Sequence, residues 1–185
     1  MHADVHAFSF NAGGSKLYVG SDGGMWSTTN VGVTSVTWSD LNTTLALTQF
    51  YPTFALSAST PNLALIGTQD NGTQIYSGGF TWKYTNCGDG FSIAINPANN
   101  IIMWAVCEGK TIIKSIDGGS TWSRLATGIN FNAPGPPAFA MEFQNPNTLY
   151  AGTANVWQTI DGGSTITGSS GTVNRTLNLS LTVNH

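Results

Sequence analysis

The chain has 185 residues, of which 41% are apolar and only 8% are charged, and its formal net charge is −3. The apolar content excludes a disordered chain, and the scarcity of Lys and Arg excludes the basic patch that nucleic-acid binding requires. No apolar run is long enough to span a membrane as a helix. Neutral polar residues must therefore supply the solubility, a composition typical of secreted or cell-surface proteins.

Short apolar segments recur in pairs along the chain. The first segments of the four pairs are residues 7–10, 54–56, 92–95 and 138–141, and the second segments are residues 17–20, 65–67, 104–106 and 149–152. Turns rich in Asn, Pro and Gly separate the two members of each pair, as expected between adjacent strands. No 3.6-residue apolar period is sustained, so we expect little helix.

A recurring dipeptide follows each pair of segments. It is Thr-Trp at residues 37–38, 81–82 and 121–122, and Thr-Ile at residues 165–166, and the copies are 44, 40 and 44 residues apart. Four short strands in each repeat of this length are typical of a β-propeller blade. The sequence therefore predicts an all-β fold, a β-propeller of about four four-stranded blades, with another antiparallel sandwich as the alternative. The expected blades are residues 2–42, 43–86, 87–130 and 131–166.

Two of the repeats contain a specific hairpin motif. Residues 115–122 match the Asp-box pattern Ser-x-Asp-x-Gly-x-Thr-Trp at every fixed position, and residues 159–166 match it with Thr for Ser and Ile for Trp. The first two repeats carry degenerate versions. In such a hairpin Asp bonds the turn backbone, Gly takes a positive φ and Trp packs between blades. We therefore expect structural roles for Ser115, Asp117, Gly119, Thr121, Trp122, Asp161 and Gly163.

Further motifs follow one another along the chain: HADVHAF at residues 2–8, VGSDGGMW at 19–26, GTQDNGT at 67–73 and CGDGF at 87–91. With the repeat, they resemble the extracellular Asp-box (BNR-repeat) propellers related to sortilin-type domains and to xyloglucan-cleaving glycoside hydrolases. The likeness covers roughly residues 2–166. Such relatives usually have seven or more blades. The resemblance thus implies part of a longer propeller, a four-bladed ring, or a subunit that completes its ring with another copy.

Three carboxylates are candidates for catalysis. Asp22, Asp70 and Asp89 lie in Gly-rich segments at strand ends, where glycine allows a ligand to approach closely. A glycosidase needs two carboxyl groups, an acid and a base or nucleophile. The resemblance implies a catalytic aspartate in an Asp-x-Gly-Gly-like context, which Asp22 approaches without the intervening residue, and a second aspartate from another propeller domain. Turn formation is the alternative role.

Metal-ligating side chains alternate at the start of the chain. His2, Asp4 and His6 would face one side of a strand over residues 2–6, and Asp22 would be a fourth ligand if the first two strands pair. Imidazole and carboxylate together suit a divalent metal. The alternative is a polar hydrogen-bonded cluster, with no cofactor bound.

The chain has two cysteines, Cys87 and Cys107. They flank a predicted hairpin that turns at residues 97–100, which brings its two ends together. A disulfide between them fits an oxidising compartment.

The last residues predict a connector and a long strand. Residues 167–171 are small and polar, and in the predicted strand, residues 172–185, apolar and polar side chains alternate over 172–183, interrupted at Arg175. This strand would be the outer strand of the fourth blade, or it would add to the sheet edge of another copy. We expect a secreted interaction or structural module that binds a glycan or protein, or assembles with itself. The alternative is a glycoside hydrolase fragment.

Overall fold

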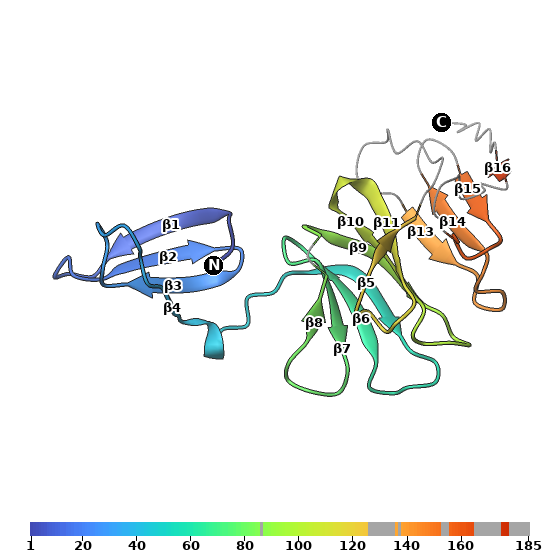
Figure 1. The fold of residues 1–185 in the computed structure, drawn as a ribbon, viewed down its shortest axis with the longest axis horizontal. Helices are drawn as coiled ribbons and strands as arrows, with labels where there is room; N and C mark the ends of the chain where they lie inside the picture. Colours follow the sequence, from blue (N-terminus) through green and yellow to red (C-terminus); the bar gives the residue numbers. More distant parts are fainter. Residues whose placement is uncertain (86, 126–135, 137, 153–155, 165–174, 178–185) are drawn as a thin grey trace, which may run out of the picture. The chain divides into compact units, whose positions relative to one another are not determined.

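The computed structural model describes residues 1–85, 87–125, 136, 138–152, 156–164 and 175–177. These residues form four antiparallel four-stranded sheets, so the chain is all-β and propeller-like (Figure 1). Within the described residues the helices are two short 3₁₀ turns, η1 (Asn42–Thr44) and η2 (Glu108–Lys110). The strands are β1 (Val5–Phe10), β2 (Leu17–Ser21), β3 (Gly24–Thr28), β4 (Ser39–Asp40), β5 (Phe50–Leu56), β6 (Ala64–Thr68), β7 (Thr73–Tyr76), β8 (Lys83–Tyr84), β9 (Gly90–Ile95), β10 (Met103–Cys107), β11 (Thr111–Ser115), β12 (Ser123–Arg124), β13 (Ala138–Met141), β14 (Leu149–Gly152), β15 (Val156–Thr159) and β16 (Arg175–Leu177).

The chain divides into two compact units, Met1–Gln49 and Phe50–His185. The first unit holds the sheet β1-β2-β3-β4, in which each strand pairs with the next one along the chain. The second unit holds the other three sheets, built in the same order of strands. The eight segments that the sequence analysis paired fall on the first and second strands of the four sheets.

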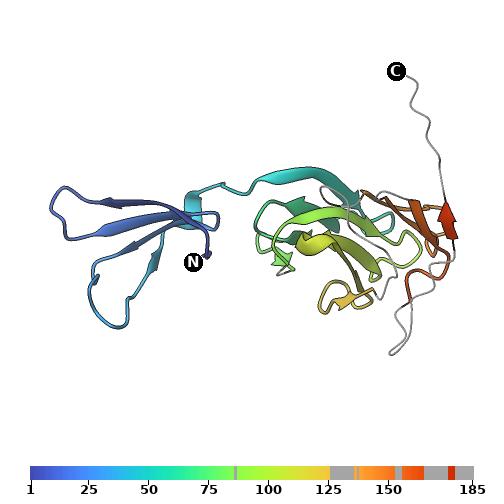
Figure 2. The ribbon, with the colours of Figure 1, turned by 90° about the horizontal axis from the view of Figure 1, so that it is seen from above.

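The core of the second unit lies where its sheets meet. Figures 1 and 2 show the three sheets side by side, and β9 contacts β5 and β6 of the preceding sheet and β13 of the following one. All five residues of β10 are buried, including Trp104 with 0% exposure. Two apolar clusters form this core, one around Trp104, Val106 and Leu149, the other around Leu65 and Ile75.

The hairpin at residues 115–122 connects β11 to β12 and packs against the preceding sheet. The Asp117 carboxylate accepts hydrogen bonds from the Ser115 hydroxyl, at 2.8 Å, and from the Thr121 backbone N–H, also at 2.8 Å, as well as from the Thr121 hydroxyl. Gly119 has a φ of +80°, and a Cβ there would lie 2.2 Å from Ile75 Cδ1 in the preceding sheet. Asp117 therefore shapes a turn that packs closely against the neighbouring sheet.

The equivalent turn after β15 repeats this arrangement as far as it is described. The Thr159 hydroxyl donates to Asp161, and Asp161 Oδ1 accepts the Gly163 N–H at 3.0 Å. A Cβ at Gly163 would lie 2.6 Å from Leu125 Cδ1. The last two motif positions, residues 165 and 166, lie outside the described residues.

Acid is expected to weaken the 115–122 hairpin. Hydrogen bonds from the Thr121 hydroxyl and N–H, and from Ser115, lower the pKa of Asp117 from 3.8 to about 2. Because the folded-state pKa is depressed, the carboxylate contributes stability above pH 4, and the contribution is lost as the pH falls toward 2. The Asp117→Asn variant should thus be less stable than the parent chain at pH 5, and the difference should shrink by pH 2. Urea unfolding at both pH values measures this, and a difference independent of pH would contradict it.

The predicted C-terminal strand is described only at β16. Its three residues pair antiparallel with β15, with Val156 opposite Leu177 and Gln158 opposite Arg175. This pairing is the one expected of an outer strand in its own sheet. The connector 167–171 and the rest of the predicted strand, residues 172–174 and 178–185, lie outside the described residues. No described helix is long and apolar enough to cross a membrane.

Candidate functional site

The structure brings two of the three candidate aspartates together. Asp70 follows β6 and Asp89 precedes β9, and the backbone N–H of Asp70 donates to Asp89 Oδ1 at 2.7 Å. Both residues are partly exposed. The third candidate, Asp22, lies in the first unit between β2 and β3. We call Asp70, Asp89 and their partners Tyr51 and Glu108 the carboxylate site.

Glycines allow the two chain segments of this site to approach. Gly72 forms a parallel bridge with Asp89, and its N–H donates to the carbonyl oxygen of Gly88 at 2.6 Å. A Cβ at Gly72 would lie 1.9 Å from the Thr85 oxygen, and one at Gly90 would lie 2.3 Å from the Gly72 oxygen. No other residue fits such separations, so glycine here sets the distance between the two aspartates.

Asp70 adopts an unusual backbone conformation. Its φ is +59°, and it is the one non-glycine residue with a positive φ among those described. Aspartate is more tolerant of this left-handed region than most residues, yet the conformation still costs about 1–3 kcal/mol. The hydrogen bond from its N–H to Asp89 Oδ1 stabilises this turn and brings the Asp70 backbone to the Asp89 carboxylate.

Tyr51, on β5, completes the site. Its hydroxyl donates to Asp89 Oδ2 at 2.9 Å, so both oxygens of Asp89 accept hydrogen bonds. Burial, the hydrogen bond to Asp89 and the charges of Asp89, Asp70 and Glu108 raise the pKa of Tyr51 to about 12. The phenol is therefore protonated at physiological pH and acts as a donor. The sequence analysis missed Tyr51, because its only signal was an alternation in β5 that Thr53 and Ala55 share.

A disulfide lies next to the carboxylate site. Cys87 and Cys107 are bonded, with their Cα atoms 5.5 Å apart, which confirms the predicted pairing. Cys87 lies two residues before Asp89, and Cys107 immediately precedes Glu108, whose N–H donates to the Asp89 carbonyl oxygen at 2.8 Å. The site therefore presents carboxylate hydrogen-bond acceptors on a backbone that hydrogen bonds and a disulfide constrain. Such acceptors suit a hydroxyl-rich ligand.

The predicted cluster of histidines and aspartates also forms, but the backbone that carries it differs from the regular strand expected. His6 Nε2 lies 2.9 Å from both carboxylate oxygens of Asp22, and His2 Nδ1 lies 3.8 Å from Asp22 Oδ2. The expectation of a regular strand over residues 2–6 is wrong, because β1 begins at Val5 and its register shifts between Val5 and Ala7. His6 lies at this register shift, opposite the turn that carries Asp22.

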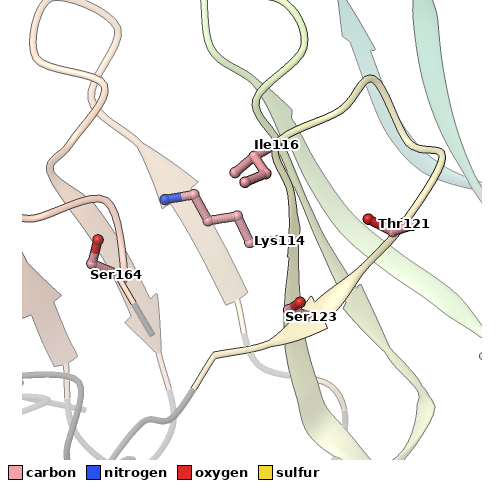
Figure 3. Close-up of a pocket in the computed structure, with 5 residues that line it drawn as sticks. All are labelled: Lys114, Ile116, Thr121, Ser123 and Ser164. Atoms are coloured by element: carbon pink, nitrogen blue, oxygen red, sulfur yellow. The ribbon is translucent and has the colours of Figure 1, made fainter. Parts of the chain in front are cut away.

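A small open cavity of about 190 Å³ lies beside Lys114 on β11 (Figure 3). The Lys114 ammonium points toward the following hairpin, donates to the Gly162 oxygen at 2.9 Å and lies 5.5 Å from the centre of the Trp104 ring. Burial lowers the pKa of Lys114, and the nearby Asp161 opposes that shift. The side chain thus links two sheets beside the cavity.

Comparisons with known proteins give the fold. No family model matches the chain, and no curated protein matches it. Among solved structures, an ancestral GH74 enzyme is similar with a TM-score of 0.51 and 20% identity, over 88% of this chain and 23% of the enzyme. The GH74 xyloglucanase from Xanthomonas campestris has a TM-score of 0.48 and 15% identity, over 86% of this chain and 28% of its own.

YCF48 from Cyanidioschyzon merolae has a TM-score of 0.46 and 21% identity, over 64% of this chain and 36% of its own. The chain spans about a quarter of the length of the ancestral GH74 enzyme. Four antiparallel four-stranded sheets and the likeness to the ancestral GH74 enzyme together indicate an all-β, propeller-like fold.

Proposed function

We propose that the chain is a segment of an extracellular Asp-box β-propeller that binds a polysaccharide at the carboxylate site. The observation that carries the proposal is the convergence of Asp70 and Asp89, with Tyr51, on a backbone shaped by glycines. Sugar hydroxyls are hydrogen-bond donors, and partly exposed carboxylates are strong acceptors for them. The disulfide and the low content of charged residues support an extracellular location.

A glycan is preferred to a protein ligand for two reasons. The ancestral GH74 enzyme with this fold belongs to a class of glycoside hydrolases, and the motifs of the chain resemble those of xyloglucan-cleaving propellers. Self-assembly through the C-terminal strand stays a prediction, because most of that strand lies outside the described residues.

Hydrolysis of the glycan is the second candidate function, favoured by the presence of two carboxylates in one site. In that reaction Asp89, which accepts two hydrogen bonds, would be the base or nucleophile, and Asp70 would be the acid. Asp22 remains a further catalytic candidate. Binding without hydrolysis is preferred because both Asp89 oxygens already have partners within the protein and because the chain spans 23% of the enzyme it is similar to.

Affinity electrophoresis in gels that contain xyloglucan, mixed-linkage β-glucan or mannan tests the proposal. The parent chain should be retarded by at least one of them. Asp70→Asn and Asp89→Asn should weaken that binding about tenfold, because each removes a charged acceptor. Tyr51→Phe should weaken it less, since it removes only the donor that orients Asp89.

Glu142→Gln is the matched control, because Glu142 is an exposed acid in the same unit and lies after β13, outside the site. It should bind like the parent chain. No retardation of the parent chain by any of the three polysaccharides, or equal retardation of all variants, would overturn the proposal. Release of reducing ends by the parent chain, lost in Asp70→Asn, would establish the hydrolase alternative.

A further inference from the structure

Two imidazoles and two carboxylates gather in the first unit, away from the carboxylate site in sequence. His2 Nδ1 lies 3.7 Å from Asp4 Oδ2 and 3.8 Å from Asp22 Oδ2. One ligand atom from each of these three residues can be chosen so that all lie within 4.8 Å of one another. His6 Nε2, at 2.9 Å from Asp22, brings a second imidazole to the same carboxylate.

The turn between β2 and β3 places Asp22 at the centre of this cluster. The Asp22 N–H donates to the Asp4 carbonyl oxygen at 3.2 Å, which joins the start of the chain to the turn. Glycine at residue 23 leaves room for His2, because a Cβ at residue 23 would lie 2.8 Å from His2 Cβ. The close approach of His2 to Asp22 is thus built into the backbone and requires glycine at this position.

Asn42 supports the same turn through its side chain. Its Oδ1 accepts the Met25 N–H at 2.7 Å, and its Nδ2 donates to the Gly23 oxygen at 3.4 Å. Gly24 has a φ of +102° and leaves room for this amide. The side chains of His2 and Asp22 are 25% and 24% exposed, so two of the four groups are largely shielded from water. Asn42 thus fixes the backbone of the turn that carries Asp22, whereas His2 Nδ1 accepts the Asp4 N–H at 3.2 Å, a hydrogen bond that a bound ion would replace.

The distances and donor types select the kind of ion. Nitrogen and oxygen ligands at about 2.0–2.1 Å from a tetrahedral zinc ion lie roughly 3.3–3.4 Å from one another. The separations of 3.7 and 3.8 Å from His2 Nδ1 to the two carboxylates come within a few tenths of an ångström of that value. Imidazole together with carboxylate suits zinc and its neighbours, whereas calcium and magnesium prefer oxygen ligands alone.

We propose that His2, Asp4 and Asp22 bind one zinc-class divalent cation, with His6 hydrogen-bonded to Asp22 beside it. The ion neutralises the two carboxylates and fastens residues 2–4 to the β2–β3 turn. The site adds stability to the first unit, because an ion that binds only the folded state shifts the unfolding equilibrium by mass action. The cation site is independent of polysaccharide binding at the carboxylate site in the second unit.

Calorimetry tests the proposal, with zinc chloride titrated into the untagged, chelator-treated full chain. We expect saturable binding with one zinc per chain, and a melting temperature that rises with zinc concentration. Asp22→Asn, His2→Ala and Asp4→Asn should each weaken zinc binding by 10-fold or more. Calcium chloride at the same concentrations should give no saturable heat.

His185→Ala is the matched control, because His185 is the one histidine outside the cluster. It should bind zinc like the parent chain. Asp4 is 64% exposed, so Asp4→Asn leaves the fold intact even if Asp22→Asn does not, and circular dichroism of each variant verifies this. Absence of saturable zinc binding by the parent chain, or unchanged binding in the folded Asp4→Asn and His2→Ala variants, would overturn the proposal.

Discussion

Replacing Gly72 with alanine is expected to lower the free energy of unfolding by about 3 kcal/mol or more. Gly72 has a φ of +70°, and a Cβ there would lie 1.9 Å from the oxygen and 3.1 Å from the carbon of the Thr85 carbonyl. These are backbone atoms, which cannot move aside as a flexible side chain can. The Gly72 oxygen also accepts bonds from the N–H and hydroxyl of Thr68, so a shift of the backbone would break them.

Gly118→Ala separates the two causes of that loss. Gly118 has the same φ of +70°, but nothing lies within 4 Å of a Cβ at this position. Its substitution should therefore cost only about 1 kcal/mol, the strain of alanine in the left-handed region. Urea unfolding monitored by tryptophan fluorescence measures both variants. Equal losses for the two would show that the close approach at Gly72 contributes nothing.

The strands of this fold were predictable because their signal is local. The paired segments are recognisable in the sequence as apolar stretches between Asn-, Pro- and Gly-rich turns. In the structure these segments form the first two strands of each sheet. The fourth strands were harder to predict, since β4, β8 and β12 have two residues each and depend on pairing with the strand before them. Short outer strands leave almost no periodicity to detect.

The carboxylate site was predictable only in part. Gly-rich surroundings marked Asp70 and Asp89 separately, but their contact depends on the parallel bridge between Gly72 and Asp89, which is a tertiary feature. Tyr51 had no local signal beyond the alternation of β5, which Thr53 and Ala55 share. The cation cluster shows the opposite case, because the pairing of β1 with β2 was foreseen and indeed brings Asp22 to His6, while the register shift at His6 was not foreseen. Local patterns locate elements, but contacts between elements position the groups that carry chemistry.

Removal of the disulfide is the other change that we expect to lower the free energy of unfolding strongly. Cys87 and Cys107 are 20 residues apart in sequence, and in the chain-entropy account a crosslink over a loop of this length stabilises the fold by about 3 kcal/mol. The double substitution Cys87→Ala and Cys107→Ala should lower the free energy of unfolding by that amount. Refolding of the parent chain in a thiol reductant should produce the same loss, and the double variant should not respond to the reductant.

The effect of this disulfide on binding distinguishes two roles for it. If the bond acts mainly by restricting the unfolded chain, the folded site keeps its contacts, including the hydrogen bond from Tyr51 to Asp89. The double variant should then bind polysaccharide as well as the parent chain at low temperature, well below its unfolding transition. A tenfold loss of binding under those conditions would mean that the bond positions Asp89 directly. Since backbone hydrogen bonds from Gly72 and Glu108 already hold the segment around Asp89, we expect binding to persist.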